Sequence, residues 1–395
     1  MHIRIFHQYF RTPETGGSLR SYFIARELVR KGFEVSVITA TNRSNAHTEE
    51  LEGFRVHYLP VYYTNHLGFL SRIRAFLRFV NLAVNKSGLL GSADLNYVIS
   101  TPLSTGLIGL YEKRFRATDY IFEVGDIWPE APIQLNVLRN PILKIAARKL
   151  ESLIYRNAWM LVGLSDDISK HISEKAGRND VFTITNFSEG DSLSCSQPVS
   201  KIRASIGLKK QEFVIAYTGT LGRANHLEFL VDFAKVIPEN LHVKIIIMGE
   251  GAREKQLKDY SAKMRMNERI QFIGSGDRSR VACILSAADA VYISFDQAPV
   301  LQTGCPNKLF DALALGKLVI INFGGWIDSL ISANNIGFSY HPGEEKKAVK
   351  RLINYMDPDI LEGVKRRGRQ LSESYTAQNQ LTELIHYLEK KKKAG

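Results

Sequence analysis

Short apolar strands alternate with helical stretches in both halves of the chain, and this alternation limits the fold more than any other feature of the sequence. In the first half, apolar segments at residues 3–6 and 35–38 flank a glycine-containing loop and an amphipathic helical stretch. In the second half, apolar segments at 214–217 and 243–248 flank a similar loop and helix. This pattern is typical of a doubly wound, mostly parallel sheet. The sequence therefore predicts an α/β protein.

The division of the pattern into two parts predicts the domain organisation. At 395 residues the chain is too long for one ordinary hydrophobic core. Residues 188–200 are polar and lack periodicity, as expected of a linker. We therefore predict two facing Rossmann-like domains, at 1–187 and 201–375, with a cleft between them. We also expect the last helix, at about 376–395, to pack back on the first domain.

Composition and charge limit the partners and the compartment. The hydrophobic content of 45% and the charged content of 23% are typical of a globular protein, and no apolar run approaches the ~20 residues of a membrane span. The net charge of +12 predicts an anionic partner, which can be nucleic acid, acidic lipid or a phosphorylated substrate. Cys195, Cys283 and Cys305 lack the spacing of a zinc site or a disulfide framework, which favours a reducing cytoplasm.

A basic, aromatic segment at residues 53–93 contains no Asp or Glu. Leu70, Ile73 and Leu77 recur within it at helical spacing, so we predict an amphipathic basic helix over about 67–85. A second basic helix is predicted at about 141–157. Such helices can lie on an anionic membrane surface. The alternative is an apolar stripe that faces the core, with a solvated basic back.

The loop after the first strand contains Gly16 and Gly17, where a dinucleotide-binding fold would carry G-x-G-x-x-G. The loop is long, its glycines are adjacent, and no acidic residue closes the second strand, so an NAD site loses support. Two adjacent glycines allow a ligand to approach the backbone closely, and a plain flexible loop is an equal alternative.

Residues 303–317 combine the features of an anion site at a helix start. Pro306 stands where its missing N–H is no loss, and Gly316 is a typical residue after a helix. The unpaired N–H groups of a first helical turn attract anions. Lys308 adds a cation, and Asp311, one turn further, can accept from a pair of hydroxyl groups. These residues predict a cradle for the phosphates and ribose of a nucleotide; an ordinary helix start is the alternative.

Two acidic residues follow a predicted strand of the first half. Asp126 and Glu130 come shortly after the apolar segment at 120–124. Ligands of open parallel sheets bind at the carboxyl ends of the strands, so either carboxylate can act as a catalytic or acceptor-orienting group. Helix capping is the alternative role for both.

Taken together, these segments resemble glycosyltransferase family 4, retaining sugar-nucleotide enzymes of the GT-B fold, over essentially the whole chain. Residues 25–39 resemble the family pattern that follows an N-terminal Gly-Gly loop, and residues 217–219 and 249–251 resemble its second-domain strand ends. Residues 306–317 resemble the donor loop P-N-K-L/F-F-D-A-L-A-x-G-K of bacterial L-fucosamine transferases. That last run is the most specific of these motifs.

The resemblance implies a donor site shared by both domains. We expect a sugar nucleotide to lie against Gly16, Gly17, Gly219, Arg223, Gly249, Ile273, Gly274, Pro306, Asn307, Lys308, Leu309 and Asp311. By the same resemblance, Ile273 and Gly274 frame the nucleobase and Asp311 binds the ribose hydroxyls.

The chain also departs from the family pattern. Thr303 stands where the family has the first of two glutamates, which fits a donor with fewer hydroxyl groups, such as an acetamido-deoxy sugar. Thr220 and Asn225 stand where the family has an Arg and a Lys. From charge and place, we expect Arg223 and Lys308 to neutralise the diphosphate instead.

The resemblance implies a retaining transferase that moves N-acetyl-L-fucosamine, or a related N-acetylated deoxy sugar, from a UDP-sugar to a polyprenyl-diphosphate-linked saccharide in bacterial O-antigen or capsule synthesis. Asp126, Glu130 and Lys308 are the expected catalytic residues. No cofactor or metal is expected, because cations and a helix start can stabilise the leaving diphosphate. We expect a cytoplasmic protein at the inner face of the membrane, without a nucleic-acid partner. The alternatives are a UDP-sugar 2-epimerase and an inactive sugar-nucleotide-binding scaffold.

Overall fold

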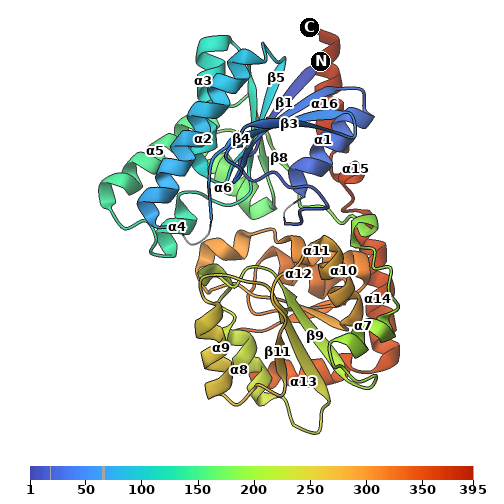
Figure 1. Ribbon diagram of the computed structural model, residues 1–395. Coiled ribbons are helices and arrows are strands. Elements are labelled where there is room, and N and C mark those ends of the chain that lie inside the picture. Colours follow the sequence, from blue (N-terminus) through green and yellow to red (C-terminus); the bar gives the residue numbers. More distant parts are fainter. Residues whose placement is uncertain (18, 65–66, 395) are drawn as a thin grey trace.

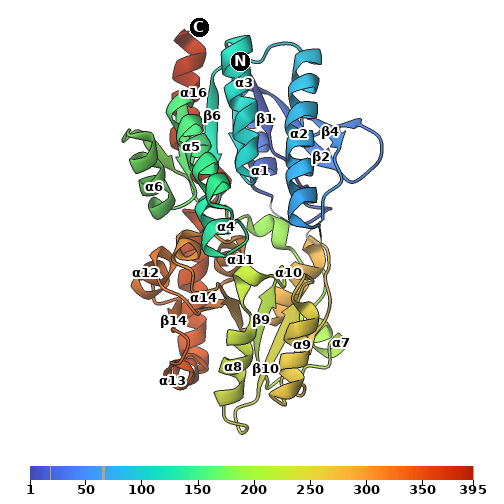
Figure 2. The same ribbon diagram turned by 90° about the vertical axis from the view of Figure 1, so that its left-hand side faces the viewer.

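Two sheets, one in each half of the chain, organise the molecule (Figure 1). The structure is a computed structural model that describes residues 1–17, 19–64 and 67–394. Each sheet is covered by helices on both faces, and the two units face one another across a narrow boundary (Figures 1 and 2). The predicted fold class, two facing Rossmann-like α/β domains, is confirmed.

Within the described residues, the first sheet has eight strands in the order β3-β4-β2-β1-β5-β6-β7-β8. All neighbours are parallel except β3 and β4. The central strands are buried on both faces, which explains why they carry continuous apolar runs. The strands are β1 (His2–Phe6), β2 (Glu34–Thr41), β3 (His47–Leu51), β4 (Phe54–Pro60), β5 (Leu95–Ile99), β6 (Tyr120–Val124), β7 (Met160–Gly163) and β8 (Val181–Thr183).

The helices of the first unit lie on both faces of this sheet. They are α1 (Arg20–Arg30), α2 (Phe69–Leu89), η1 (Leu103–Thr105), α3 (Gly106–Arg116), α4 (Glu130–Gln134), α5 (Pro141–Asn157) and α6 (Asp166–Ala176). The predicted basic helices at 67–85 and 141–157 are therefore present as α2 and α5. Only Ala75, Phe79, Ala83 and Ser87 of α2 are buried. Leu70 and Leu77 are 67% and 52% exposed, so the interpretation of the apolar stripe as core-facing is wrong for these two residues, whereas Val80 and Val84 of the same stripe pack against the core.

The second sheet is parallel throughout, and its order within the described residues is β11-β10-β9-β12-β13-β14. Its strands are β9 (Phe213–Thr218), β10 (Val243–Met248), β11 (Ile270–Phe272), β12 (Ala290–Ile293), β13 (Leu318–Ile321) and β14 (Gly337–Ser339). The helical segments of this half are η3 (Arg223–Asn225), α8 (Glu228–Val236), α9 (Glu254–Lys263), α10 (Arg278–Ala287), η4 (Pro299–Thr303), α11 (Asn307–Leu315), α12 (Trp326–Ala333), α13 (Glu345–Tyr355) and α14 (Pro358–Glu373).

The segment between the sheets contains η2 (Gly190–Leu193) and leads into α7 (Val199–Ser205). Cys195, just after η2, forms a disulfide with Cys283 of α10, and their Cα atoms are 5.0 Å apart. The expectation of unpaired cysteines is therefore wrong for these two. Folding packs α10 against η2, a proximity that 88 residues of separation conceal. Cys305 is free and buried.

The chain crosses back to the first unit at its end. α15 (Ala377–Gln380) and α16 (Thr382–Ala394) lie beside α1 (Figure 1). Leu384 and Leu388 of α16 belong to the same buried cluster as Ile3 and Val35 of the first sheet. The last helix thus covers part of the first sheet and ties the two units together at a second crossing point.

No helix in the described part of the chain is both long enough and apolar enough to cross a bilayer.

Candidate active site

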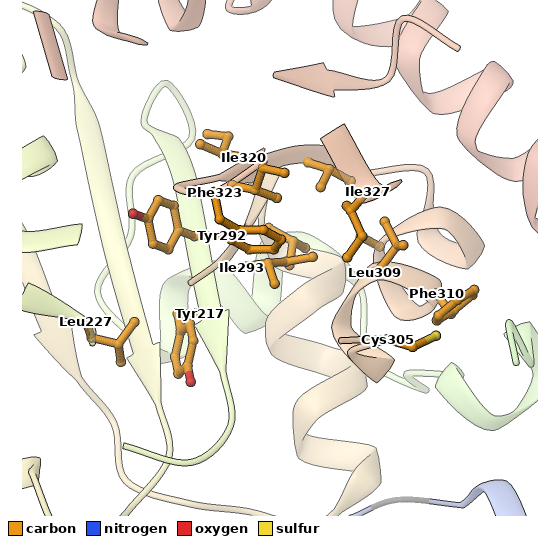
Figure 3. Close-up of a cluster of buried hydrophobic side chains, with 14 of the residues drawn as sticks. Tyr217, Leu227, Tyr292, Ile293, Cys305, Leu309, Phe310, Ile320, Phe323 and Ile327 are labelled. Atoms are coloured by element: carbon orange, nitrogen blue, oxygen red, sulfur yellow. The ribbon is translucent and has the colours of Figure 1, made fainter. Parts of the chain in front are cut away.

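The helix α11 forms the centre of the candidate site, and its packing fixes which side chains face the boundary between the units. Leu309 and Phe310 are fully buried in the core of the second unit (Figure 3). Asn307 and Lys308, the first two residues of the helix, are only partly buried. The helix begins after Pro306 and ends at Gly316, whose φ of 63° is left-handed. Both predicted helix ends are confirmed.

Hydrogen bonds across the boundary hold the first unit against the start of α11. Ser165 Oγ donates to the carbonyl oxygen of Thr303 at 2.7 Å. The backbone N–H of Asn186 lies 3.3 Å from Cys305 Sγ, and the backbone N–H of Val300 donates to Gln134 Oε1 at 3.0 Å. The first unit therefore contacts the segment that leads into α11.

Two glycine loops of the second unit lie back to back beside α11. Gly219 and Gly249 have φ values of 140° and 155°. The backbone N–H of Gly219 donates to the Met248 carbonyl, and a Cβ added at Gly249 would lie 1.8 Å from the Gly219 carbonyl oxygen. A Cβ added at Gly251 would lie 2.4 Å from the Leu221 carbonyl oxygen. Glycine is required here because the two loops touch through their backbones.

Lys308 lies across the Gly219 turn. Its ammonium nitrogen is 5.0 Å from the centre of the Tyr217 ring, and a Cβ at Gly219 would lie 2.9 Å from it. Burial lowers the pKa of Lys308 to about 8, although the nearby Asp311 carboxylate opposes this effect. Lys308 forms no ion pair within the described part of the chain. A bound diphosphate would supply a counter-charge for this buried ammonium group.

Asp311, the residue expected to bind ribose, is held by an arginine. Its carboxylate oxygens accept from the two terminal nitrogens of Arg278 at 2.9 and 2.7 Å. The Asp311 side chain is only 7% exposed. Gly16 of the first unit packs on the start of α10, since a Cβ there would lie 3.4 Å from the backbone nitrogen of Arg278. A ribose would therefore have to share this carboxylate with Arg278 or displace the guanidinium.

Several other predicted donor residues lie around these loops. Arg223 is exposed and, among the described residues, makes no ion pair or side-chain hydrogen bond. Gly274 has a φ of 70°, and the carbonyl of Ile273 accepts from Arg280 at 3.1 Å. Gly17, Asn307 and Asp311 together line a small pocket beside Arg278. The fully buried Leu309 contributes to packing; its side chain is not open to a ligand.

The two acids expected to act in catalysis have different surroundings. Asp126 follows β6 and keeps an exposed surface, but the surrounding protein displaces enough water to raise the pKa of its carboxyl group. Glu130, at the start of α4, accepts from Arg148 at 2.7 and 3.1 Å, and this pairing lowers its pKa. Asp126 is therefore the better placed of the two to accept a proton.

An ion-pair network behind Asp126 was not predicted. Glu123 of β6 is fully buried and accepts from Arg20 at 2.7 and 2.8 Å and from the Tyr97 hydroxyl at 2.5 Å. Arg20 also donates to the Ile184 carbonyl at 2.9 Å. This network fixes the end of β6, which carries Asp126, against the start of α1. The sequence signal for this network was Glu123, a charged residue within the otherwise apolar strand β6.

A large cavity opens beside these loops. It has a volume of about 980 Å³ and extends from Thr220, Glu250 and Gly251 of the second unit into the first unit, between α2, α4 and α5. Of the predicted site residues, Gly17 lines it. Among the described residues, no group of three or more His, Cys, Asp or Glu side chains is arranged to hold a metal ion.

Comparison with known families gives one match for each half of the chain. Residues 15–186 match the family described as "Glycosyl transferase 4-like domain". Residues 198–370 match the family described as "Glycosyl transferases group 1". The two matched ranges correspond to the two sheets and include the glycine loops, α10 and α11.

A curated relative and two solved structures are similar to the chain. The UDP-Gal:alpha-D-GlcNAc-diphosphoundecaprenol alpha-1,3-galactosyltransferase of Escherichia coli is 24% identical over 160 residues, 40% of this chain and 40% of that protein. The chain thus matches less than half the length of the curated relatives. Sucrose-phosphate synthase from Thermosynechococcus elongatus superimposes with a TM-score of 0.81 at 15% identity, over 100% of both chains.

HepE from Anabaena, in complex with UDP, superimposes with a TM-score of 0.71 at 18% identity, over 99% of this chain and 100% of that chain. At these identities the structural likeness shows the fold alone, which is GT-B. Because the two family matches together extend over both units, the chain belongs to the glycosyltransferases of the GT-B fold.

Proposed function

We propose that the chain is a retaining glycosyltransferase that moves an N-acetylated deoxy sugar, with N-acetyl-L-fucosamine as the best candidate, from a UDP-sugar to a lipid-linked saccharide in bacterial O-antigen or capsule synthesis. The observation that carries this proposal is the position of Lys308. A partly buried ammonium group at the start of α11 faces two backbone-packed glycine loops, where a sugar nucleotide would place its diphosphate.

The leaving group of such a reaction is a nucleoside diphosphate, so the site must stabilise negative charge that grows on the β-phosphate. Lys308, the first N–H groups of α11 and the exposed Arg223 are suited to this task. In our mechanism these groups stabilise the charge that a metal ion would otherwise stabilise, and we propose that transfer requires no metal. The Gly16–Gly17 loop lies over the same end of the cleft and can close on the donor.

The incoming hydroxyl group loses its proton as the new glycosidic bond forms. In a retaining reaction of this kind, the departing phosphate can accept that proton, and Asp126 can orient the hydroxyl. We assign Glu130 a supporting role, because both of its oxygens are held by Arg148. The mechanism thus needs the partly buried cation of Lys308, the first N–H groups of α11, and Asp126, whose carboxyl group has a raised pKa.

We propose a lipid-linked acceptor because the Escherichia coli relative is named for alpha-D-GlcNAc-diphosphoundecaprenol, which is a sugar linked to a lipid diphosphate. The exposed apolar and basic surface of α2 and α5 supports this choice and suits a peripheral site on an anionic membrane. N-acetyl-L-fucosamine is proposed from the run at 306–317 and from Thr303, which replaces an acid that would bind sugar hydroxyls.

The test measures nucleoside-diphosphate release from a panel of UDP-sugars, with membranes that carry lipid-linked N-acetylglucosamine as acceptor. We expect acceptor-dependent release with UDP-N-acetyl-L-fucosamine, lost in Lys308→Met and kept in Lys209→Met, which removes an exposed lysine far from α11. The anomeric configuration of the product, read by NMR, tests retention. Conversion of the donor without acceptor would indicate an epimerase, and binding of UDP-sugars without any turnover would indicate a scaffold.

A further inference from the structure

The large cavity has two chemically different ends. Its inner end touches the second unit at Thr220, Glu250 and Gly251, beside the glycine loops. Its outer part is lined by helices of the first unit. That part is lined mainly by apolar side chains of α2 and α5, including Ile73, Phe76, Leu77, Ala146, Ala147 and Leu150. We name this outer part the α2–α5 groove.

A row of aromatic rings runs along the cavity. The rings of Tyr9 and Tyr63 are 5.1 Å apart, those of Tyr63 and Phe76 are 5.7 Å apart, and those of Phe76 and Trp128 are 6.5 Å apart. All four residues line the cavity. Thr101 and Ser104, which carry hydroxyl groups, also line the cavity.

The rim of the groove exposes apolar side chains that the fold leaves uncovered. On α5, Ile142, Leu143 and Ile145 are 74%, 43% and 55% exposed, and on α2 Leu70 is 67% exposed. Several exposed apolar side chains on the helices that line a cavity indicate a binding surface. The surface is also positively charged, since α2 contains no acidic residue and the Glu151 carboxylate of α5 is buried.

We propose that the α2–α5 groove binds the hydrocarbon chain of the acceptor, in the form of the isoprenoid units next to the diphosphate. An isoprenoid diphosphate matches the apolar groove, the aromatic row and the surrounding positive charge. Because the groove and the inner end belong to one cavity, the acceptor sugar then lies near the glycine loops. This inference rests on the proposed function, because it assigns the lipid part of the same acceptor.

The first experiment measures binding and needs no turnover. Farnesyl diphosphate, which has no sugar to glycosylate, is titrated into the full-length chain. We expect binding, and we expect Ala146→Trp, which fills the groove from α5, to weaken it at least about tenfold, the effect of losing two buried methylenes. Leu153→Trp, on an exposed position of α5 that does not line the cavity, leaves the charge unchanged; it is the matched control and should bind as the wild type does.

A second variant places a charge on the facing wall. Leu77 of α2 is 52% exposed and lies outside the core, and Leu77→Asp should weaken farnesyl diphosphate binding to a similar extent. Equal binding by the wild type, Ala146→Trp and Leu77→Asp, each with unchanged circular dichroism, would overturn the proposal. Equal binding of inorganic diphosphate and farnesyl diphosphate would also overturn it, because the hydrocarbon would then add nothing.

The second experiment uses turnover with sugar-diphosphate acceptors that carry one or three isoprene units, in the absence of membranes. We expect KM to fall at least about tenfold with the longer chain, and we expect this gain to disappear in Ala146→Trp and to remain in Leu153→Trp. Transfer without any dependence on chain length would refute the groove. Farnesyl diphosphate binding without transfer to either acceptor would refute the proposed function and leave the groove in place.

Discussion

The pKa of Lys308 predicts how nucleotide binding should depend on pH. Only the charged ammonium group can pair with a diphosphate. Burial places the pKa at about 8, so the group is mostly protonated at neutral pH and loses its proton as the pH rises through that value. The UDP dissociation constant should therefore increase by about tenfold from about pH 7 to about pH 9, if the protonated form alone binds.

Two substitutions separate the charge of Lys308 from its titration. A hydrogen bond to a charged group contributes about 1.5–3 kcal/mol, so Lys308→Met should weaken UDP binding about 10- to 150-fold at neutral pH. The same variant should lose the pH dependence. Lys308→Arg keeps a positive charge across the whole range, so it should bind more tightly than the methionine variant and also show a flat profile.

Isothermal titration calorimetry with UDP is the suitable assay, because binding is measured without an acceptor or a chosen sugar. Circular dichroism at each pH checks that the fold is unchanged. A flat profile in the wild type would refute the argument, since it would mean that Lys308 does not face the diphosphate. A tenfold change that persists in Lys308→Arg would assign the titration to another group.

Further predictions test the neighbouring parts of the site. Gly249→Ala should lower the free energy of unfolding by about 2–5 kcal/mol, measured by urea denaturation, because its Cβ would meet the Gly219 carbonyl oxygen. Gly343→Ala, with φ of 94° and open space, should cost only about 1–2 kcal/mol, and equal losses would contradict the contact. Arg278→Met should release Asp311 and increase the preference for UDP over 2′-deoxy-UDP, measured as a ratio of dissociation constants; an unchanged ratio would show that Arg278 does not compete with ribose. Turnover should persist in excess EDTA, and a loss restored by Mg²⁺ would refute metal-independent transfer.

Local signals in the sequence were sufficient to predict α11. Pro306 and Gly316 bracket it, and their backbone preferences act within a single turn of helix. The partner of Asp311 could not be predicted in the same way, because Arg278 lies 33 residues earlier and reaches it only after α10 packs beside α11. The disulfide of Cys195 was missed for the same reason. Contacts that depend on packing between elements leave no local pattern.

The amphipathic helix α2 shows a different limit. Helical spacing predicted that Leu70, Ile73 and Leu77 share a face, but it could not say what covers that face. The helix instead turns Ala75, Phe79 and Ala83 toward the sheet, because small residues allow close approach and Phe79 fills the remaining space. Periodicity thus identifies an apolar face, whereas the shape of the neighbouring surface decides which face is buried.

The helix α16 is synthesised after the second unit, yet it completes the hydrophobic core of the first unit. Leu381, Leu384 and Leu388, which are translated after the whole second unit, belong to the same buried cluster as Ile3. During synthesis, the face of the first sheet that α16 covers therefore stays exposed until the whole second unit has been translated. Domains usually fold in turn as they emerge. Here the core of the N-terminal unit is completed only after the second unit has been made. Until then its exposed apolar face is a surface to which a chaperone can bind.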